Sequence, residues 1–152
     1  MGIDAERTDR RQVLAIRERF LSDEELVMIP ADDIAANVQA WTIKEAVYKA
    51  ALGMGLSLRD NIRIRKMPIP GPPVPVFKPV DYGLKSSQKE LPEDFFGEAE
   101  IVITGNSASA SDETGNERDL NNSTFKIYSY LSDDFIITLA WSPLCIRFGK
   151  SS

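Results

Sequence analysis

Residues 34–52, IAANVQAWTIKEAVYKAAL, decide the fold because they form the longest helical pattern in the chain. Spacings of four and three residues place one set of side chains on a single stripe of this helix: Ile34, Val38, Trp41, Glu45, Tyr48 and Leu52. The opposite face carries Ala36, Ala40, Ile43, Val47 and Ala50. Both sides of the helix are therefore expected to be covered by other parts of the fold. Asp32 or Asp33 should cap its start, and Gly53 should end it.

Glu45 stands in the middle of the otherwise apolar or aromatic stripe. Burying an unpaired carboxylate costs roughly several kcal/mol unless a cation or strong donors meet it. Lys49, one turn later, offers an ordinary ion pair worth about 0.2–0.5 kcal/mol. The alternative is that Glu45 converges with Asp4 and Glu6 on a hard cation, which prefers oxygen ligands. Lys44 and Lys49 would then hold phosphate oxygens on that cation.

The segment before the long helix predicts a strand end and two short helices. Asp4 and Glu6 project to the same side of a strand over residues 3–6, either as a solvated strand end or as cation ligands. Asp9 is expected to cap a first helix, in which Val13, Ile16 and Phe20 share a face. Residues 22–25, SDEE, match a capping box, so a second helix should begin there and stop before Pro30.

Beyond the long helix the hydrophobic period changes from that of a helix to that of a strand. Ile62 and Ile64 alternate with Arg63 and Arg65. Further strands are expected at residues 98–104, 123–131, 135–141 and 145–148, with a hairpin turn at 132–134. Residues 68–79 are too rich in proline for an interior strand, and residues 105–122 are expected to form a mobile loop. The predicted fold class is α+β, with helices packed on a small antiparallel sheet.

Composition restricts the kind of protein and the chemistry available to it. The chain has 152 residues, 43% hydrophobic and 27% charged, which predicts one domain over residues 1–152. One cysteine and no histidine exclude a disulfide framework and the commonest metal ligand, so the chemistry must use carboxylates, lysines, hydroxyls or a hard metal. A net charge of −5 argues against nucleic acid as a partner. No apolar stretch predicts a membrane span or a secretion signal, so a cytoplasmic location is expected.

Four motifs in order resemble those of the 4′-phosphopantetheinyl transferase superfamily. Residues 2–6, GIDAE, resemble its G-I-D-x-E signature, and residues 41–50, WTIKEAVYKA, resemble its W-x-x-K-E-x-x-x-K-x signature. Residues 19–25, RFLSDEE, are similar to R-F-[FL]-S-x-x-E, and residues 53–58, GMGLSL, to the G-x-G-L-S-L segment that leads into the next strand. Together these elements cover residues 2–58 and are specific as a set.

The resemblance implies a phosphopantetheinyl transferase fold and the transfer of 4′-phosphopantetheine from coenzyme A to a serine of an acyl or peptidyl carrier protein, with release of 3′,5′-ADP. It implies that Mg²⁺ is bound by the carboxylates of Asp4, Glu6 and Glu45. Lys44 and Lys49 would contact the coenzyme A diphosphate, and Glu25 or Lys49 would assist deprotonation of the serine. Glu25 is also the third helical residue of the capping box, so a purely structural role stays open.

The chain departs from the family pattern in two respects. In the surfactin-synthetase-activating type, G-I-D-x-E opens the second of two similar halves, and a Ser-His pair before it contacts coenzyme A; this chain starts at the motif and has no histidine. We therefore expect either the second half of a longer protein, which pairs with a partner half, or a homo-oligomer like the trimeric holo-acyl-carrier-protein synthases. The alternative function is a noncatalytic half-domain that binds divalent metal or phosphate, or that only pairs with the missing half.

Arginines near the N-terminus are candidates for recruiting the carrier protein, whose surface is expected from the family to be acidic. These are Arg10, Arg11 and Arg17. A solvated helix face explains the same residues without any partner.

Overall fold

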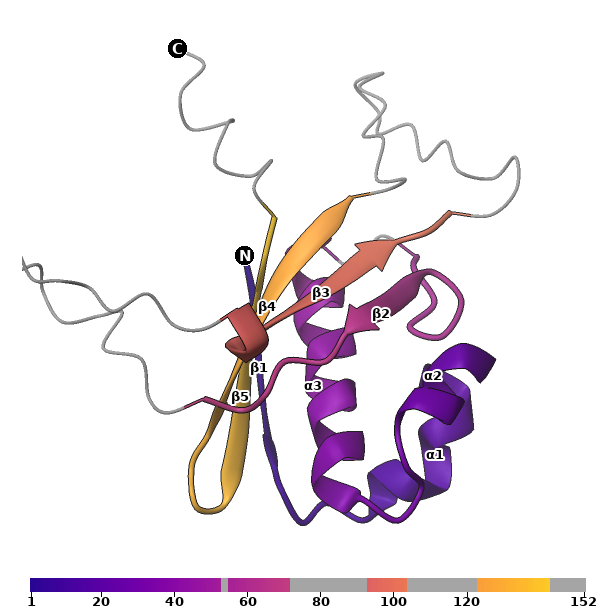
Figure 1. Ribbon diagram of the computed structural model, residues 1–152. Helices are drawn as coiled ribbons and strands as arrows, with labels where there is room; N and C mark the ends of the chain where they lie inside the picture. The colour runs from indigo at the N-terminus through magenta and orange to yellow at the C-terminus, as the bar shows by residue number, and fades with distance from the viewer. Residues whose placement is uncertain (53–54, 72–92, 104–122, 143–152) are drawn as a thin grey trace, which may run out of the picture.

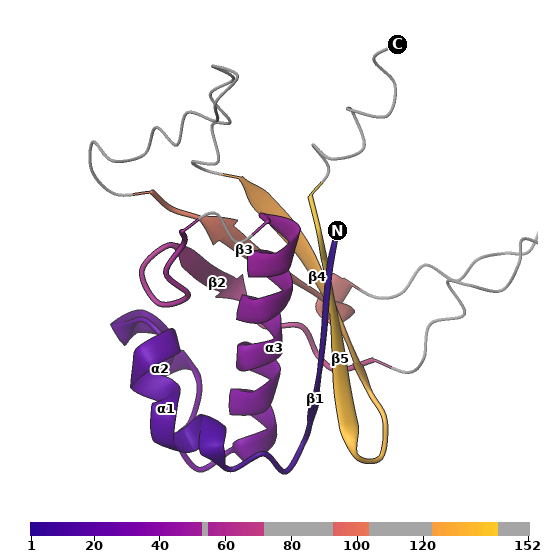
Figure 2. The ribbon, with the colours of Figure 1, turned by 180° about the vertical axis from the view of Figure 1, so that it is seen from behind.

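The computed structural model describes residues 1–52, 55–71, 93–103 and 123–142. Within these ranges three α-helices lie on one side of a five-stranded antiparallel sheet, as Figures 1 and 2 show from opposite directions. This arrangement confirms the predicted α+β class. None of the described helices is long and apolar enough to span a membrane.

The elements follow one another in a simple order along the chain. They are β1 (Gly2–Arg7), α1 (Gln12–Phe20), α2 (Asp23–Met28), α3 (Ile34–Ala50), β2 (Ile62–Lys66), the 3-10 turn η2 (Glu93–Phe95), β3 (Phe96–Ile101), β4 (Thr124–Leu131) and β5 (Phe135–Trp141). The strand order in the sheet is β1-β5-β4-β3-β2, and every neighbouring pair is antiparallel. Among the described strands, β1 therefore forms an edge of the sheet and pairs with β5 alone, with Asp4 opposite Thr138.

Two of the three predicted helix caps are confirmed. The capping box of α2 is complete, because the Ser22 hydroxyl accepts from the Glu25 amide at 3.3 Å and the Glu25 carboxylate accepts from the Ser22 amide at 2.7 Å. Asp33 caps α3 by accepting from the Ala36 amide at 3.0 Å.

The prediction that Asp9 caps α1 is wrong. The helix begins at Gln12, and no side chain caps it. The Asp9 carboxylate instead pairs with the Arg7 guanidinium, with Nε and Oδ1 3.1 Å apart. The intervening residues form a turn, in which the Arg10 amide donates to the Arg7 carbonyl at 3.2 Å. This turn separates Asp9 from Gln12, the first residue of α1.

The strand predictions agree with the structure apart from their ends. β5 has the predicted bounds, and residues 132–134 form the hairpin turn, which is closed by a 2.8 Å hydrogen bond from the Ser132 amide to the Phe135 carbonyl. β3 begins at Phe96 and ends at Ile101, so the predicted strand at 98–104 was placed too late. The predictions for residues 105–122, 145–148 and Gly53, and for most of the proline-rich segment, lie outside the described residues.

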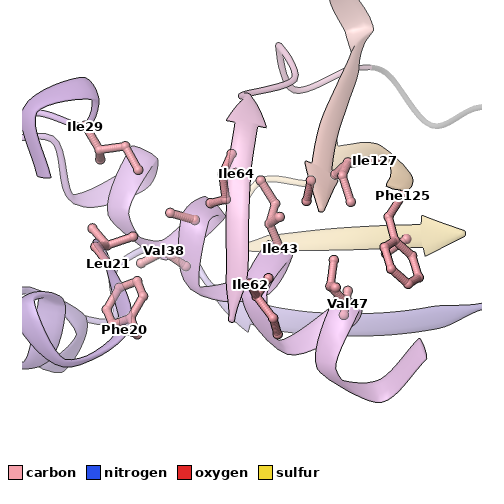
Figure 3. Close-up of a cluster of buried hydrophobic side chains, with 14 of the residues drawn as sticks. Phe20, Leu21, Ile29, Val38, Ile43, Val47, Ile62, Ile64, Phe125 and Ile127 are labelled. Atoms are coloured by element: carbon pink, nitrogen blue, oxygen red, sulfur yellow. The ribbon is translucent and has the colours of Figure 1, made fainter. Parts of the chain in front are cut away.

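The hydrophobic core fills the space between α3 and the inner face of the sheet. Figure 3 shows Ile43 and Val47 of α3 near side chains from β2 and β4, while Val38 lies toward Phe20 at the end of α1. On the sheet side the cluster includes Ile62, Ile64, Ala99, Ile101, Phe125, Ile127, Ile136 and Ala140. The predicted covering of both sides is confirmed in part: Ile43 and Val47 are buried, the stripe with Trp41 and Tyr48 is partly buried, and Leu52 is 70% exposed.

Gly2 allows β1 to lie directly against α3. A Cβ atom at this position would stand 1.8 Å from the Ala46 carbonyl oxygen and 2.8 Å from the Ala50 amide nitrogen, distances that no side chain can adopt. Asp4 and Glu6 follow Gly2 on the same face of the strand, and both are less exposed than the residues between them. The close contact at Gly2 therefore brings the two carboxylates alongside the long helix.

Candidate active site

Asp4 and Lys49 join β1 to the C-terminal half of α3. The Lys49 ammonium donates to the Asp4 Oδ1 atom at 2.7 Å and to the Ile3 carbonyl at 3.2 Å. The Asp4 side chain is only 13% exposed, whereas Lys49 is 50% exposed. The second carboxylate oxygen of Asp4, Oδ2, is buried and has no hydrogen-bond partner among the described residues. Among the described residues, the Asp4 carboxylate thus has a cationic partner at Oδ1 and no partner at Oδ2.

Glu45 lies one turn before Lys49 on α3 and is half-buried. Burial and the nearby charge of Asp4 raise the pKa of the Glu45 carboxyl, and the cations Lys49 and Arg10 oppose this effect only in part. The simple ion pair between Glu45 and Lys49 that their spacing allows does not form, because Lys49 pairs with Asp4 instead. Asp4 and Glu45 are thus neighbouring carboxylates, and Lys49 is paired with Asp4.

Glu6 is held at the turn that follows β1. One of its carboxylate oxygens accepts from the Arg10 guanidinium, and the other accepts from the Arg7 amide at 3.1 Å. Arg10 also lies over the Trp41 ring, 5.9 Å from its centre. An open pocket of about 450 Å³ adjoins this turn and is lined by Glu6, Arg7, Asp9, Arg10 and Gln12.

Glu25 and Lys44 form a second charged pair inside the protein. The Lys44 ammonium lies 2.8 Å from Glu25 Oε1 and also donates to the Leu58 and Ile62 carbonyls. The other oxygen of Glu25 accepts from the Ile64 amide at 2.7 Å. The Lys44 side chain has no exposed surface and that of Glu25 is 3% exposed. Burial lowers the pKa of Lys44, and the charge of Glu25 opposes that shift.

A comparison with protein-family models identifies the family. The model of the 4′-phosphopantetheinyl transferase superfamily matches residues 1–103. The chain belongs to this superfamily. The match includes β1, the three helices, β2 and β3, and with them Asp4, Glu6, Glu25 and both lysines of the long helix. No curated protein and no solved structure was found that matches the chain. The membership agrees with the resemblance of the four sequence motifs.

The site of this phosphopantetheinyl transferase domain brings together only part of the predicted set of carboxylates. Within the described ranges, no group of three or more histidine, cysteine, aspartate or glutamate side chains is close enough to hold a metal ion. Asp4 and Glu45 lie near enough to influence one another electrostatically, whereas Glu6 is bound by Arg10. The predicted ligand roles of the three carboxylates stay predictions.

The pair Asp4 and Glu45 nevertheless fits Mg²⁺ bound together with a diphosphate. Mg²⁺ usually takes one or two protein carboxylates and completes its coordination with water and substrate phosphates. A cation at this position would give the buried Oδ2 atom of Asp4 a partner. It would also lower the raised pKa of Glu45. The donor set therefore suits this ion without a third carboxylate.

Glu25 and Lys44 do not face the pair formed by Asp4 and Lys49. Their polar atoms are buried and engaged with the protein, so neither side chain presents an atom to a substrate in this structure. The capping role of Glu25 is confirmed, while the substrate roles of both residues stay predictions that require them to become exposed. The pairing of Glu25 with Lys44 was not predicted from the sequence. The pairing of Glu6 with Arg10 was not predicted either, although a separation of four residues could have indicated it.

Proposed function

We propose that this domain transfers 4′-phosphopantetheine from coenzyme A to a serine of an acyl or peptidyl carrier protein in a Mg²⁺-dependent reaction that releases 3′,5′-ADP. The proximity of Asp4, Glu45 and Lys49, where β1 lies against α3, supports this proposal most. Two carboxylates for a hard cation and one ammonium group for phosphate oxygens suit a metal-diphosphate substrate.

Asp4 and Glu45 would hold the metal, which when bound offsets the negative charge that develops on the leaving phosphate. Lys49 would contact the diphosphate. Its hydrogen bond to Asp4 raises the pKa of the Lys49 ammonium, so this group is charged at neutral pH. A charged lysine suits a phosphate contact better than removal of the serine proton. Glu6 would contribute only after leaving Arg10.

The direct test is transfer to a carrier protein. We would incubate the purified chain with Mg²⁺, coenzyme A and an apo carrier protein, and follow the mass of the carrier. A gain of one phosphopantetheine group that depends on Mg²⁺ would support the proposal. Binding of coenzyme A without any transfer would instead support the alternative, a noncatalytic half-domain that binds divalent metal or phosphate or pairs with the missing half. The cytoplasmic location expected from the sequence stays a prediction.

We also propose that a partner half or a second copy covers the outer face of the sheet near β1. β1 is an edge strand, and two large hydrophobic side chains on the face away from α3 are exposed, Ile3 at 48% and Phe135 at 45%. They lie on paired strands, β1 and β5. An edge with exposed apolar neighbours is a typical site of association.

Light scattering at increasing concentration should show dimers or larger assemblies of the purified chain. The substitution Ile3→Glu should shift the protein toward monomer, because a charge would then lie in the apolar contact. The matched control is Val27→Glu, since Val27 on α2 is 88% exposed and lies on another part of the surface. A wild-type protein that stays monomeric at high concentration would contradict the proposed assembly.

We expect Arg11 to contribute most to recruiting an acidic carrier protein, because it is exposed whereas Arg10 and Arg17 are engaged within the protein. Arg17 is engaged with the Asn37 side chain at 3.0 Å and the Ile29 carbonyl at 2.6 Å, and Arg10 is bound to Glu6. Arg11→Glu should raise the carrier-protein KM several-fold and weaken its salt dependence. Lys126→Glu on the opposite side of the sheet is the charge-matched control. An unchanged KM and salt dependence would indicate a merely solvated helix face.

A further inference from the structure

We infer that Lys49 is an internal competitor of the metal: in the free protein its ammonium group takes the place of a cation at Asp4, and metal binding releases it toward the substrate phosphates. The inference rests on the proposed function, because it concerns the same carboxylates. It adds an order of events, in which the metal has to displace a lysine of the protein before that lysine can bind the diphosphate.

The inference is based on the contacts of Lys49. Its Nζ atom lies 2.7 Å from Asp4 Oδ1, a distance typical of a direct charge-assisted hydrogen bond. The bond joins α3 to β1 across 45 residues of sequence, so it does not arise from the helix itself. Asp4 Oδ2 remains buried without a partner among the residues that the structure describes. The lysine therefore satisfies half of a carboxylate that a metal ion could satisfy more completely.

A divalent cation held by Asp4 and Glu45 would stand next to the Lys49 ammonium group. Like charges at such short distances repel one another strongly where water is partly excluded. Lys49 is able to withdraw, because half of its side chain is exposed and its four-carbon stem is flexible. Because the side chain is half-exposed, its withdrawal would leave no buried cavity, and Asp4 and Glu45 would be left to hold the cation.

The released ammonium group would then lie close to any diphosphate bound to the metal. Each ligand would thus favour the other: the metal frees the lysine, and the anion gives the freed lysine a partner. By thermodynamic linkage, this is a positive coupling between metal and anion binding. Lys49 would act first as the counter-ion of Asp4 and afterwards as a ligand of the substrate.

The test measures binding of Mg²⁺ alone, without coenzyme A, by titration calorimetry on the full chain. Lys49→Met should bind Mg²⁺ about fivefold more tightly than wild type, which corresponds to about 1 kcal/mol for the loss of a partly exposed competing ion pair. Lys49→Arg keeps the cation and should bind no more tightly than wild type. Lys66→Met, on β2 at the other edge of the sheet, makes the same change in net charge and should leave Mg²⁺ affinity unchanged.

Equal or weaker Mg²⁺ binding by Lys49→Met would overturn the inference and leave the proposed metal site intact. Absence of Mg²⁺ binding in every form would overturn both. If the fivefold change is found but the carrier protein is never modified, the inference stands and the proposed transfer reaction fails.

A second measurement uses the wild-type chain, in case Lys49→Met does not fold. Lysines carrying ¹³C-methyl groups report their surroundings by NMR, and the Lys49 signal is assigned from its absence in Lys49→Arg. Addition of Mg²⁺ should move this signal and leave that of Lys66 in place. A Lys49 signal that does not respond to saturating Mg²⁺ would overturn the inference.

Discussion

Replacing Lys44 by methionine should lower the free energy of unfolding by about 3–5 kcal/mol, the usual cost of removing one partner of a buried ion pair. Methionine fills much of the space of the lysine but leaves the Glu25 carboxylate buried without its cation. The Leu58 and Ile62 carbonyls also lose their donor. Urea unfolding of the wild type and the variant, followed by circular dichroism, measures the difference.

The double variant Glu25→Gln/Lys44→Met provides the control. Glutamine is compatible with the third position of a capping box, and the double variant contains no lone buried charge. It should therefore be more stable than Lys44→Met alone. Lys66→Met, which removes an exposed lysine, should change stability by less than about 0.5 kcal/mol. A cost below about 1 kcal/mol for Lys44→Met would contradict a buried structural pair.

Glu45→Gln should abolish the response of the protein to Mg²⁺ while leaving the metal-free fold intact. Wild type should gain about 2.7 kcal/mol in unfolding free energy at a Mg²⁺ concentration one hundred times the dissociation constant. Without metal, the variant should be as stable as wild type or more stable, because the burial and the repulsion from Asp4 that raise the pKa of Glu45 are both relieved. Transferase activity should fall together with the Mg²⁺ response.

Thermal melts of both proteins with and without Mg²⁺ distinguish this role from a structural one. Glu18→Gln on α1 removes an exposed carboxylate and should keep the full Mg²⁺ response, which controls for the change in net charge. A structural role for Glu45 predicts a small loss of stability and no effect on metal linkage. A Glu45→Gln protein that still responds fully to Mg²⁺ would exclude Glu45 as a ligand.

The sequence by itself determined where most of the described helices and strands lie, and it indicated the family, because these depend on features that are local in the chain. The capping box at Ser22 and the helix start at Asp33 each involve contacts over three residues. The strand and hairpin signals around residues 132–141 identified β5 with its correct ends, and the four motifs identified the superfamily that the comparison then showed. One of these local predictions was wrong, because Asp9 pairs with Arg7 and does not cap the start of α1.

The tertiary structure alone decided which charges meet. Lys44 and Lys49 belong to the same helical motif, yet Lys44 pairs inside the core with Glu25, 19 residues away, and Lys49 pairs at the surface with Asp4, 45 residues away. Helical spacing shows that the two lysines point in different directions, but it cannot show what lies in either direction. The partner of Lys49 is present because β1 pairs with β5 at the edge of the sheet and Gly2 lets that strand touch α3. Ion pairs between distant segments depend on strand order and on close packing. The spacing of residues along one helix predicts neither of these.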